Sequence, residues 1–318
     1  MTIGASMGLA HKDQGLLEAT DFLTCADIAM YAAKDSGKGR LVLFEAGMRI
    51  AADERTGATA DLRVAIDEGQ LEVRYQPIVE LPAGTLRGME ALVRWRHPVR
   101  GGILPAEFIP LAETTGLIVP LGVFVLKEAC RQARRWQLED LGARPLGISV
   151  NLSAAQLDDP GLIDVVRSAL QESGLPPGSL TLEITESALV RDAEATTNRL
   201  RELKGIGVGL AIDDFGTGYS SLSYLRRFPV DVIKIDKSFV DGLGAAGPAR
   251  QLAKSIVRLA HSLHLTTVAE GVEHPQQLAR LAAMGCDAAQ GYLFARPLEV
   301  DAATDFIRQA AKPLPVAA

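Results

Sequence analysis

The chain of 318 residues is 47% hydrophobic and 23% charged, and its formal net charge is −6. It has no apolar run of about eighteen residues and no N-terminal signal sequence, which predicts a cytoplasmic protein with no membrane contact in this segment. The acidic balance excludes a broad electrostatic footprint for a DNA or RNA polymer, so any nucleotide ligand needs a local site.

The first part of the chain has few candidate elements. Met1–Ala10 and Leu41–Glu45 are short β-like runs, and Ala26–Asp35 is a helix-like run. Two strands and one helix are too few to form a domain. Met48–Gly69 is polar, alanine-rich and compatible with a helix, so we interpret residues 48–70 as a linker helix between residues 1–47 and a larger domain at 71–318.

From Leu71 onward, short apolar strands alternate with amphipathic helical stretches, which is typical of βα units around a parallel sheet. The first two strands are separated only by the turn Leu81–Gly84 and should form an antiparallel hairpin. The predicted strands are Leu71–Glu80, Thr85–Arg96, Leu146–Leu152, Leu180–Glu186, Val208–Asp214, Val230–Asp236, Thr266–Gly271 and Ala288–Phe294.

Helices are predicted in the intervals between most of these strands, several of them ended by glycine. The pattern therefore predicts an α/β fold, a TIM-type (β/α)8 barrel whose first strand is antiparallel. The predicted helices are Val119–Gln137, Gly161–Ser173, Ala193–Leu203, Ala249–Leu263, Pro275–Ala283 and Ala302–Ala311.

Polar residues lie near the carboxyl ends of the predicted strands, where barrels of this type carry their chemistry. Apolar neighbours such as Val150 and Leu152 should face the outer helices, so the polar residues between them should face the barrel axis. These residues are Glu90, Asn151, Glu183, Asp213, Asp214, Lys234, Glu270 and Gln290.

Five of these side chains are carboxylates and one, Lys234, is a cation. Any one of the carboxylates, taken alone, can be explained as a strand-end side chain that is exposed to water or paired with arginine. Together they would repel one another strongly, since two carboxylates about 4 Å apart repel by roughly 4 kcal/mol, and the cluster should bind cations. Oxygen ligands without His or Cys favour two Mg²⁺ or Mn²⁺ ions, a pair suited to hydrolysing a phosphodiester.

The ordered set of motifs resembles the EAL family of cyclic di-GMP phosphodiesterases over roughly Leu62–Arg308. Glu90-Ala-Leu92 is the motif that gives the family its name. The other matching segments are Tyr75-Gln-Pro-Ile78, Asn151, Glu183-Ile-Thr-Glu186, Asp213-Asp-Phe-Gly-Thr-Gly-Tyr-Ser-Ser-Leu222, Lys234-Ile-Asp236, Glu270-Gly-Val-Glu273 and Gln290-Gly-Tyr292.

This resemblance implies three groups of site residues. Lys234 and Glu270 would position and activate the attacking water, and Glu186 would brace the loop that follows Asp214. The implied ligands of two metal ions are Glu90, Asn151, Glu183, Asp213 and Asp214, and the implied substrate-binding residues are Gln76, Arg94, Asp236 and Gln290.

Residues Met1–Gly47 resemble the C-terminal end of a GGDEF diguanylate cyclase domain, chiefly through Ile3–Leu9 and Ala26–Arg40. The namesake GGDEF segment is absent, so we expect a non-catalytic strand-helix remnant. The resemblance further implies that the chain is a fragment of a larger GGDEF-EAL sensor protein.

The leading hypothesis is a metal-dependent phosphodiesterase that opens cyclic di-GMP to linear pGpG and acts as a homodimer. The chief alternative is a receptor that binds cyclic di-GMP without turnover. A third is another phosphodiester hydrolase on the same barrel. The complete set of expected ligands favours the first.

Overall fold

The computed structural model describes residues 4–11, 19–37, 39–81, 83–139, 145–190, 193–217, 225, 227–244 and 248–310. The chain divides into two compact units, Met1–Asp67 and Glu68–Ala318. Within the described ranges, every helix is too short or too polar to cross a bilayer.

The first unit is a parallel pair of strands joined through a helix. Strands β1 (Met7–Leu9) and β2 (Leu41–Leu43) pair in parallel, α1 (Ala19–Asp35) connects them, and α2 (Ala46–Asp67) follows. The helix expected at Met48–Gly69 is therefore present, while its role as a linker stays a prediction.

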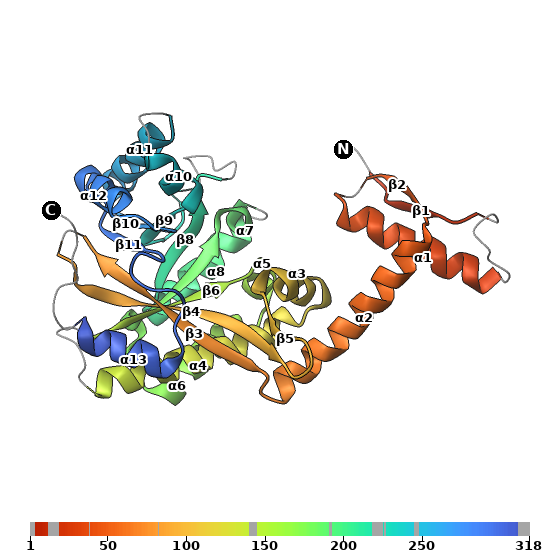
Figure 1. Ribbon diagram of the computed structural model, residues 1–318, viewed down its shortest axis with the longest axis horizontal. Coiled ribbons are helices and arrows are strands. Elements are labelled where there is room, and N and C mark those ends of the chain that lie inside the picture. The colour runs from red at the N-terminus through yellow and green to blue at the C-terminus, as the bar shows by residue number, and fades with distance from the viewer. Residues whose placement is uncertain are drawn as a thin grey trace. The chain divides into compact units, whose positions relative to one another are not determined.

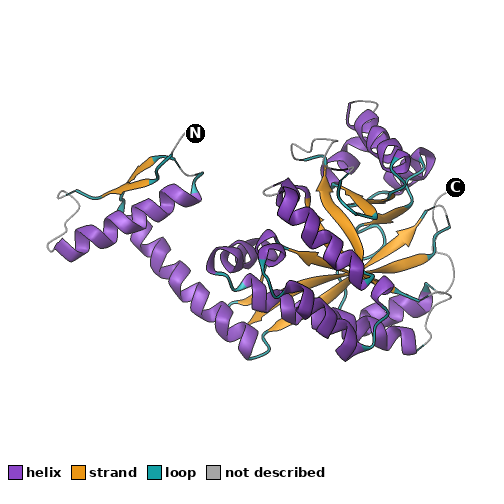
Figure 2. Ribbon diagram, turned by 180° about the vertical axis from the view of Figure 1, so that it is seen from behind, coloured by secondary structure: helices purple, strands orange, loops and turns teal. Residues whose placement is uncertain are grey.

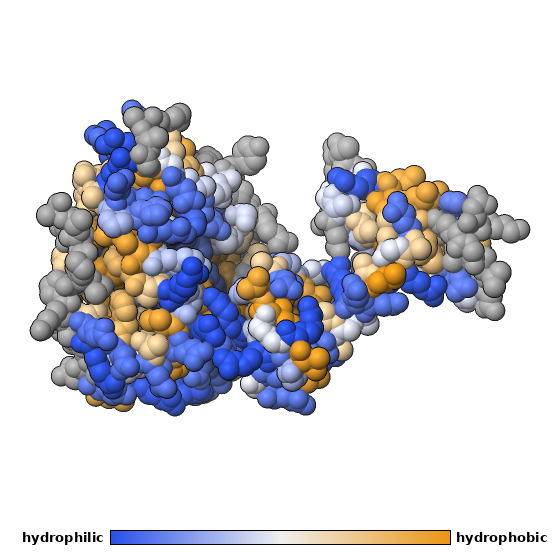
Figure 3. Space-filling view, in the orientation of Figure 1, coloured by the Kyte–Doolittle hydropathy of each residue, from blue (hydrophilic) through white to orange (hydrophobic). Residues whose placement is uncertain are grey.

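A close approach between β1 and α1 holds this unit together. A Cβ added to Gly8 would lie 1.9 Å from the carbonyl oxygen of Ala26, so only glycine lets the strand rest directly on the helix. Cys25, Ala29 and Phe44 are buried beneath the strands. The opposite face of the pair is apolar and exposed, as Figure 3 shows over β1 and β2, and it presents Met7, Leu9, Leu41 and Leu43.

The second unit contains a closed eight-stranded barrel (Figure 1). Its strand order is β3-β11-β10-β9-β8-β7-β6-β4, and pairing of β3 with β4 closes the ring. β3 runs antiparallel to both neighbours, whereas the other neighbouring pairs are parallel, so the predicted barrel with an antiparallel first strand is confirmed. The strands are β3 (Leu71–Glu80), β4 (Leu86–His97), β6 (Gly147–Leu152), β7 (Leu180–Thr185), β8 (Gly209–Phe215), β9 (Val232–Ile235), β10 (Thr266–Ala269) and β11 (Ala288–Gln290).

Helices lie on the outside of this barrel (Figure 2). Each of the six helices expected from the sequence is present within a few residues of its predicted bounds. The helices are α3 (Pro105–Thr115), α4 (Ile118–Leu138), α5 (Ala154–Asp158), α6 (Leu162–Ser173), α7 (Glu186–Val190), α8 (Ala193–Ile206), α10 (Lys237–Asp241), α11 (Pro248–Ser262), α12 (Pro275–Met284) and α13 (Val300–Gln309), with single 3-10 turns at Pro177–Ser179 and Gly242–Gly244.

Two features near β4 were not predicted. The short strand β5 (Gly101–Ile103) pairs antiparallel with the end of β4, and α3 follows it. Trp95 on β4 faces outward, and its ring meets Phe108 of α3 edge to face with centroids 5.8 Å apart. This contact places α3 against the outside of the barrel.

The eighth barrel strand is shorter than predicted because the chain turns after Gln290. Val272 donates a backbone hydrogen bond to Gln290 O, and a Cβ at Gly291 would lie 2.1 Å from Val272 O. The prediction of a strand extending to Phe294 was therefore wrong, since the close passage of two backbones at Gly291 ends the strand.

Candidate functional site

The polar residues expected at the strand ends gather at one end of the barrel, the mouth, where the parallel strands have their carboxyl ends. Directly beneath them lies an apolar layer, Ile78, Ala211, Val232, Val268 and Ala288. Each apolar residue lies two positions along the chain from one polar residue of the site. Because side chains alternate along a strand, the two residues of each pair point to the same face of the sheet. These polar residues are Gln76, Asp213, Lys234, Glu270 and Gln290, respectively. The barrel interior therefore gives the site an apolar floor.

Lys234 is the centre of the site. Its side chain is 2% exposed, and its Nζ lies 2.6 Å from Glu270 Oε1, 3.2 Å from Asp213 Oδ1 and 3.6 Å from Glu90 Oε2. It also donates a hydrogen bond to Glu183 Oε2. We call these five residues the Lys234 cluster: one lysine and four carboxylates, each on or directly after a different barrel strand.

The charges of the Lys234 cluster shift one another's pKa values. Burial alone would lower the pKa of Lys234, but the surrounding carboxylates, Glu183 foremost, outweigh burial and raise it well above its usual value. Burial raises the pKa of Glu183 well above its usual range and that of Glu270 to about 8, in both cases against the attraction of Lys234. One ammonium group is thus too little positive charge for this many buried carboxylates.

A further carboxylate borders the cluster. Asp213, Asp214 and Glu270 can each present an oxygen such that the three atoms lie within 4.8 Å of one another. Asp214 has a backbone φ of 53°, in the left-handed region that is sparsely used by residues other than glycine. Burial, followed by the negative charges of Asp213 and Asp236, raises the pKa of Asp214.

These residues fit a divalent cation. Asp213 Oδ1 is buried and accepts no hydrogen bond from any residue that the structure describes, although Lys234 lies nearby. A carboxylate oxygen without a hydrogen bond, beside two other carboxylates, is a ready cation ligand, and a ligand set made only of oxygen suits Mg²⁺ or Mn²⁺.

A chain of side-chain amides orients Glu90. Asn151 Nδ2 donates to Glu90 Oε1 at 2.6 Å, and Gln290 Nε2 donates to Glu90 Oε2 at 2.6 Å. Gln290 Nε2 also lies 3.1 Å from Gln76 Oε1, and Gln76 Nε2 donates to Ala295 O. Gln290 Oε1 is buried without a hydrogen-bond partner among the described residues, so it is available to a donor on a ligand.

Arg94 and Asp236 both make local hydrogen bonds. Arg94 is half-buried and donates to Val93 O, and burial followed by the charge of Arg74 lowers its pKa. Asp236 caps α10 by accepting a hydrogen bond from Ser238 N at 3.0 Å.

Glu186 is buried behind the strand ends, where its Oε2 accepts a hydrogen bond from Gly216 N at 2.8 Å. Gly216 has φ +99°, and a Cβ there would lie 2.9 Å from the ring of Phe239, so this position requires glycine. Residues 218–222, the rest of the loop motif noted in the sequence, lie outside the described residues.

Sequence patterns did not lead us to predict two features near the site. Arg296 stacks over the exposed ring of Tyr292, 4.3 Å from its centroid, just beyond Gln290. Ser153 and Gln156, directly after β6, form a reciprocal capping box. The spacing Ser-x-x-Gln was a sequence signal for the second feature, whereas nothing local predicts the first.

A family model described as EAL domain matches residues 59–297 of this chain. Among curated proteins, the bifunctional diguanylate cyclase/cyclic di-GMP phosphodiesterase MucR of Pseudomonas aeruginosa is 45% identical over 299 residues, which cover 94% of this chain and 43% of MucR. The cyclic di-GMP phosphodiesterase NbdA of the same species is 41% identical over 308 residues, covering 97% of this chain and 39% of NbdA. The chain thus spans about two fifths of the length of these relatives.

Solved structures give the same picture. The PaMucR phosphodiesterase in complex with c-di-GMP is 47% identical, covers 78% of this chain and 99% of its own, and superposes with a TM-score of 0.74. The FimX EAL domain from Pseudomonas aeruginosa bound to c-di-GMP is 26% identical, covers 76% of this chain and 96% of its own, and has a TM-score of 0.69.

Proposed function

The chain belongs to the EAL domain family, and we propose that it hydrolyses one phosphodiester bond of cyclic di-GMP to give linear pGpG. The observation that carries the proposal is the convergence of four carboxylates on Lys234 at the mouth of the barrel. The names of MucR and NbdA, both 41% or more identical to this chain, supply the substrate class.

The negative charge of the site calls for divalent cations. We propose that two Mg²⁺ or Mn²⁺ ions are held by Glu90, Asn151, Glu183, Asp213 and Asp214. When bound, such ions lower the pKa of a coordinated water and stabilise the charge on phosphoryl oxygens. Asn151 suits this role because its Nδ2 is used on Glu90, which leaves its Oδ1 as the ligand atom.

Lys234 and Glu270 act on the attacking water. The ammonium group of Lys234 orients the water and balances negative charge that develops on the phosphoryl oxygens. Glu270, whose Oε1 lies 2.6 Å from Lys234 Nζ, offers a carboxylate oxygen that can accept a proton from this water. Their strand-end positions fix both groups to the barrel.

The substrate is held by residues around this centre. Gln290 offers its unpartnered Oε1 to a donor on guanine, and Gln76 fixes the Gln290 amide through its own oxygen. Arg94 suits a phosphate oxygen, because a guanidinium group can donate two parallel hydrogen bonds. Asp236 completes the substrate set as an acceptor at the start of α10.

Glu186 acts through the backbone rather than on the substrate. Its bond to Gly216 N braces the segment that leaves β8 directly after Asp213 and Asp214. We further propose that the chain forms a homodimer and belongs to a larger sensor protein. We also propose that residues 1–47 derive from a GGDEF domain; they lie outside the EAL family match, which begins at residue 59.

The test is to incubate the purified chain with cyclic di-GMP and Mn²⁺ or Mg²⁺ and to follow pGpG by chromatography. Formation of pGpG that stops in excess chelator is the expected result. Calorimetric binding of cyclic di-GMP with no product over hours would instead favour a receptor without turnover. The absence of both binding and product would overturn the proposal. The Asp213→Ala variant controls for a contaminating hydrolase.

A further inference from the structure

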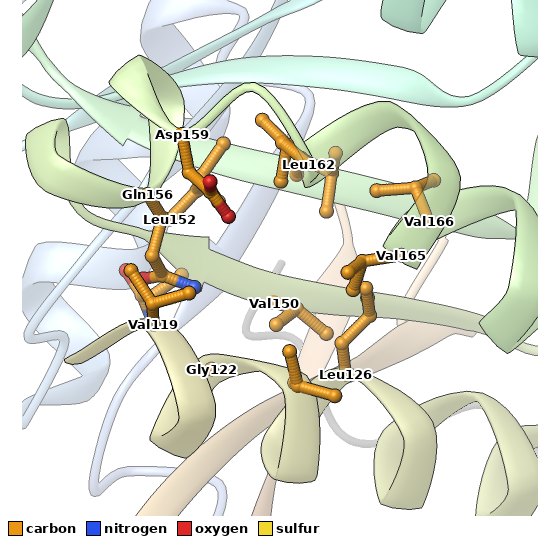
Figure 4. A pocket seen from close by; sticks show the side chains of 13 residues that line it. Val119, Gly122, Leu126, Val150, Leu152, Gln156, Asp159, Leu162, Val165 and Val166 are labelled. Carbon is orange, nitrogen blue, oxygen red and sulfur yellow. The ribbon is translucent and has the colours of Figure 1, made fainter. Parts of the chain in front are cut away.

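A glutamine of α5 lies directly against the backbone of α4. A Cβ added to Gly122 would be 1.7 Å from Gln156 Nε2, so no other residue fits at position 122 while Gln156 keeps its place. In Figure 4 the amide end of Gln156 lies beside Val119 and Gly122, at the end of a small pocket away from Val165 and Val166.

Gln156 in turn fixes the backbone that follows β6. Its Oε1 accepts a hydrogen bond from Ser153 N at 3.1 Å, and Ser153 Oγ accepts one from Gln156 N at 3.2 Å. Ser153 is the N-cap of α5 and lies two residues after Asn151. The reciprocal pair therefore determines where the chain goes as it leaves the strand.

Asn151 connects this arrangement to the Lys234 cluster. On one side its Nδ2 donates to Glu90 Oε1 at 2.6 Å, and in the sheet it is paired with Glu183 of β7. It also lines the pocket that contains Gly122 and Gln156. A series of contacts and chain connections thus leads from the outer helix α4 to the mouth of the barrel, through Gly122, Gln156, Ser153 and Asn151.

Resting on the proposed function, we propose that Gly122 and Gln156 are positioning residues for Asn151 as a metal ligand. Gly122 leaves space for the Gln156 amide, the amide holds Ser153 N, and the fixed Ser153 backbone holds the Asn151 side chain where its oxygen can coordinate a cation. Partners of this kind behind a metal ligand typically change metal affinity or activity by about 10- to 100-fold when they are replaced.

A displaced Gln156 has no equivalent position to occupy. The rest of the pocket wall is mainly apolar, with Leu126, Val150 and Leu162 among its residues, and burying an amide there without hydrogen bonds is unfavourable. Turning the side chain into solvent also breaks its bond to Ser153 N. Either movement releases the segment that carries Asn151.

The experiment compares four full-length proteins: the wild type, Gly122→Ala, Gln156→Ala and the double variant. Mn²⁺ binding to each metal-free protein is measured by calorimetry, and kcat and KM for cyclic di-GMP are measured at low and saturating Mn²⁺. Gly122→Ala and Gln156→Ala should each weaken Mn²⁺ binding about tenfold or more, with excess Mn²⁺ restoring much of kcat and KM changing less.

The double variant gives the sharpest outcome. Once Gln156 is truncated, a methyl group at position 122 no longer collides with it, so the double variant should bind Mn²⁺ as well as Gln156→Ala alone. Gly205→Ala in α8 is the matched control, because its added Cβ meets nothing within 4 Å, and it should leave Mn²⁺ binding unchanged. If Gly122→Ala does not fold, Gln156→Ala alone decides the test by its Mn²⁺ affinity.

Wild-type Mn²⁺ affinity in Gly122→Ala or Gln156→Ala, or losses that add in the double variant, would overturn the positioning role. This result is distinguishable from failure of the proposed function. A wild type that binds Mn²⁺ but forms no pGpG contradicts the function, whereas the pattern of Mn²⁺ affinities across the variants still decides whether Gly122 and Gln156 position Asn151.

Discussion

Lys234 Nζ and Glu270 Oε1 lie 2.6 Å apart, because Lys234 lies on β9 and Glu270 directly follows the neighbouring strand β10. The ammonium group of Lys234 is shared with three more carboxylates, and no single carboxylate therefore neutralises it. The proposed role of Lys234 is to orient a water beside Glu270. The alternative is a structural role, in which Lys234 only neutralises buried acids.

Replacing Lys234 tests this distinction. Lys234→Ala should lower kcat by about a hundred- to ten-thousandfold, because it removes positive charge where negative charge develops on phosphorus oxygens. Mn²⁺ affinity should be retained or raised, since the site becomes more negative. The measurement is single-turnover hydrolysis, with calorimetric Mn²⁺ binding and a thermal melt in Mn²⁺.

The matched control is Lys237→Ala. Lys237 lies three residues after Lys234, is exposed and pairs with Glu273. This variant should retain near-normal turnover, because exposed ion pairs contribute little. Near-wild-type turnover in Lys234→Ala together with a sharply lowered melting temperature would mean that Lys234 is structural.

Removal of a proposed metal ligand should abolish activity without lowering the melting temperature of the metal-free protein. Asp213→Ala or Glu90→Ala should abolish detectable pGpG formation and the rise in melting temperature that Mn²⁺ causes. The metal-free variants should melt no lower than the metal-free wild type, since each loses a carboxylate from a site with excess negative charge. Asp164→Ala, at an exposed position on α6, should behave as the wild type.

The choice of metal should affect turnover more than binding. Mg²⁺ and Mn²⁺ should both support hydrolysis and raise the melting temperature, whereas Ca²⁺ should bind and suppress turnover, because the larger ion relaxes the geometry at the reacting phosphate. Chromatography of pGpG with each metal, beside thermal melts, checks this. Equal turnover with Ca²⁺, or full turnover in excess chelator, would contradict a metal-dependent site.

The loop brace at Glu186 predicts a graded effect. Glu186→Ala removes the acceptor of the Gly216 N–H and should lower kcat by up to about a hundredfold, the size of effect expected for a misplacement of about 1 Å. Glu186→Gln keeps an oxygen that can accept the same bond and should retain most activity. Equal kinetics of Glu186→Ala and wild type at saturating metal would show that other contacts hold the segment.

The barrel and the strand-end residues could be predicted because both follow local patterns. Lys234 lies between Ile233 and Ile235, and this alternation alone places its side chain on the inner face. Helix α3 was missed because Pro105 and Pro110 suggest a break, although Pro105 lies at the first turn, where proline is favoured.

The contacts behind the site could not be predicted in the same way. Gly122 and Gln156 are far apart in the sequence, and their contact depends on how α4 packs beside α5. The bonds of Gln290 to Gln76 and Glu90 likewise require the closed barrel, because they join its last strand to its first two. Sequence patterns show which face a residue occupies, whereas these bonds depend on tertiary packing.

The end of the barrel opposite the mouth offers a test of pH dependence that does not involve the metal site. Asp287 precedes β11, and its Oδ2 accepts hydrogen bonds from Thr267 N at 2.8 Å and Thr267 Oγ1 at 2.7 Å and lies 3.0 Å from His261 Nε2. Burial would raise the pKa of Asp287, but the bonds from Thr267 and His261 outweigh it and hold the pKa below its usual value.

Since the folded state lowers this pKa, the carboxylate stabilises the protein above the usual Asp pKa of about 4, and this contribution is lost as the pH falls through the lower folded value. Asp287→Asn should therefore reduce the free energy of unfolding by about 1 kcal/mol at pH 7. The difference from wild type should shrink as the pH falls below about 4. Urea denaturation from pH 7 downward measures it, with the exposed Asp305→Asn as control. A difference between wild type and Asp287→Asn that stays constant with pH would show that the charge of Asp287 does not contribute to stability.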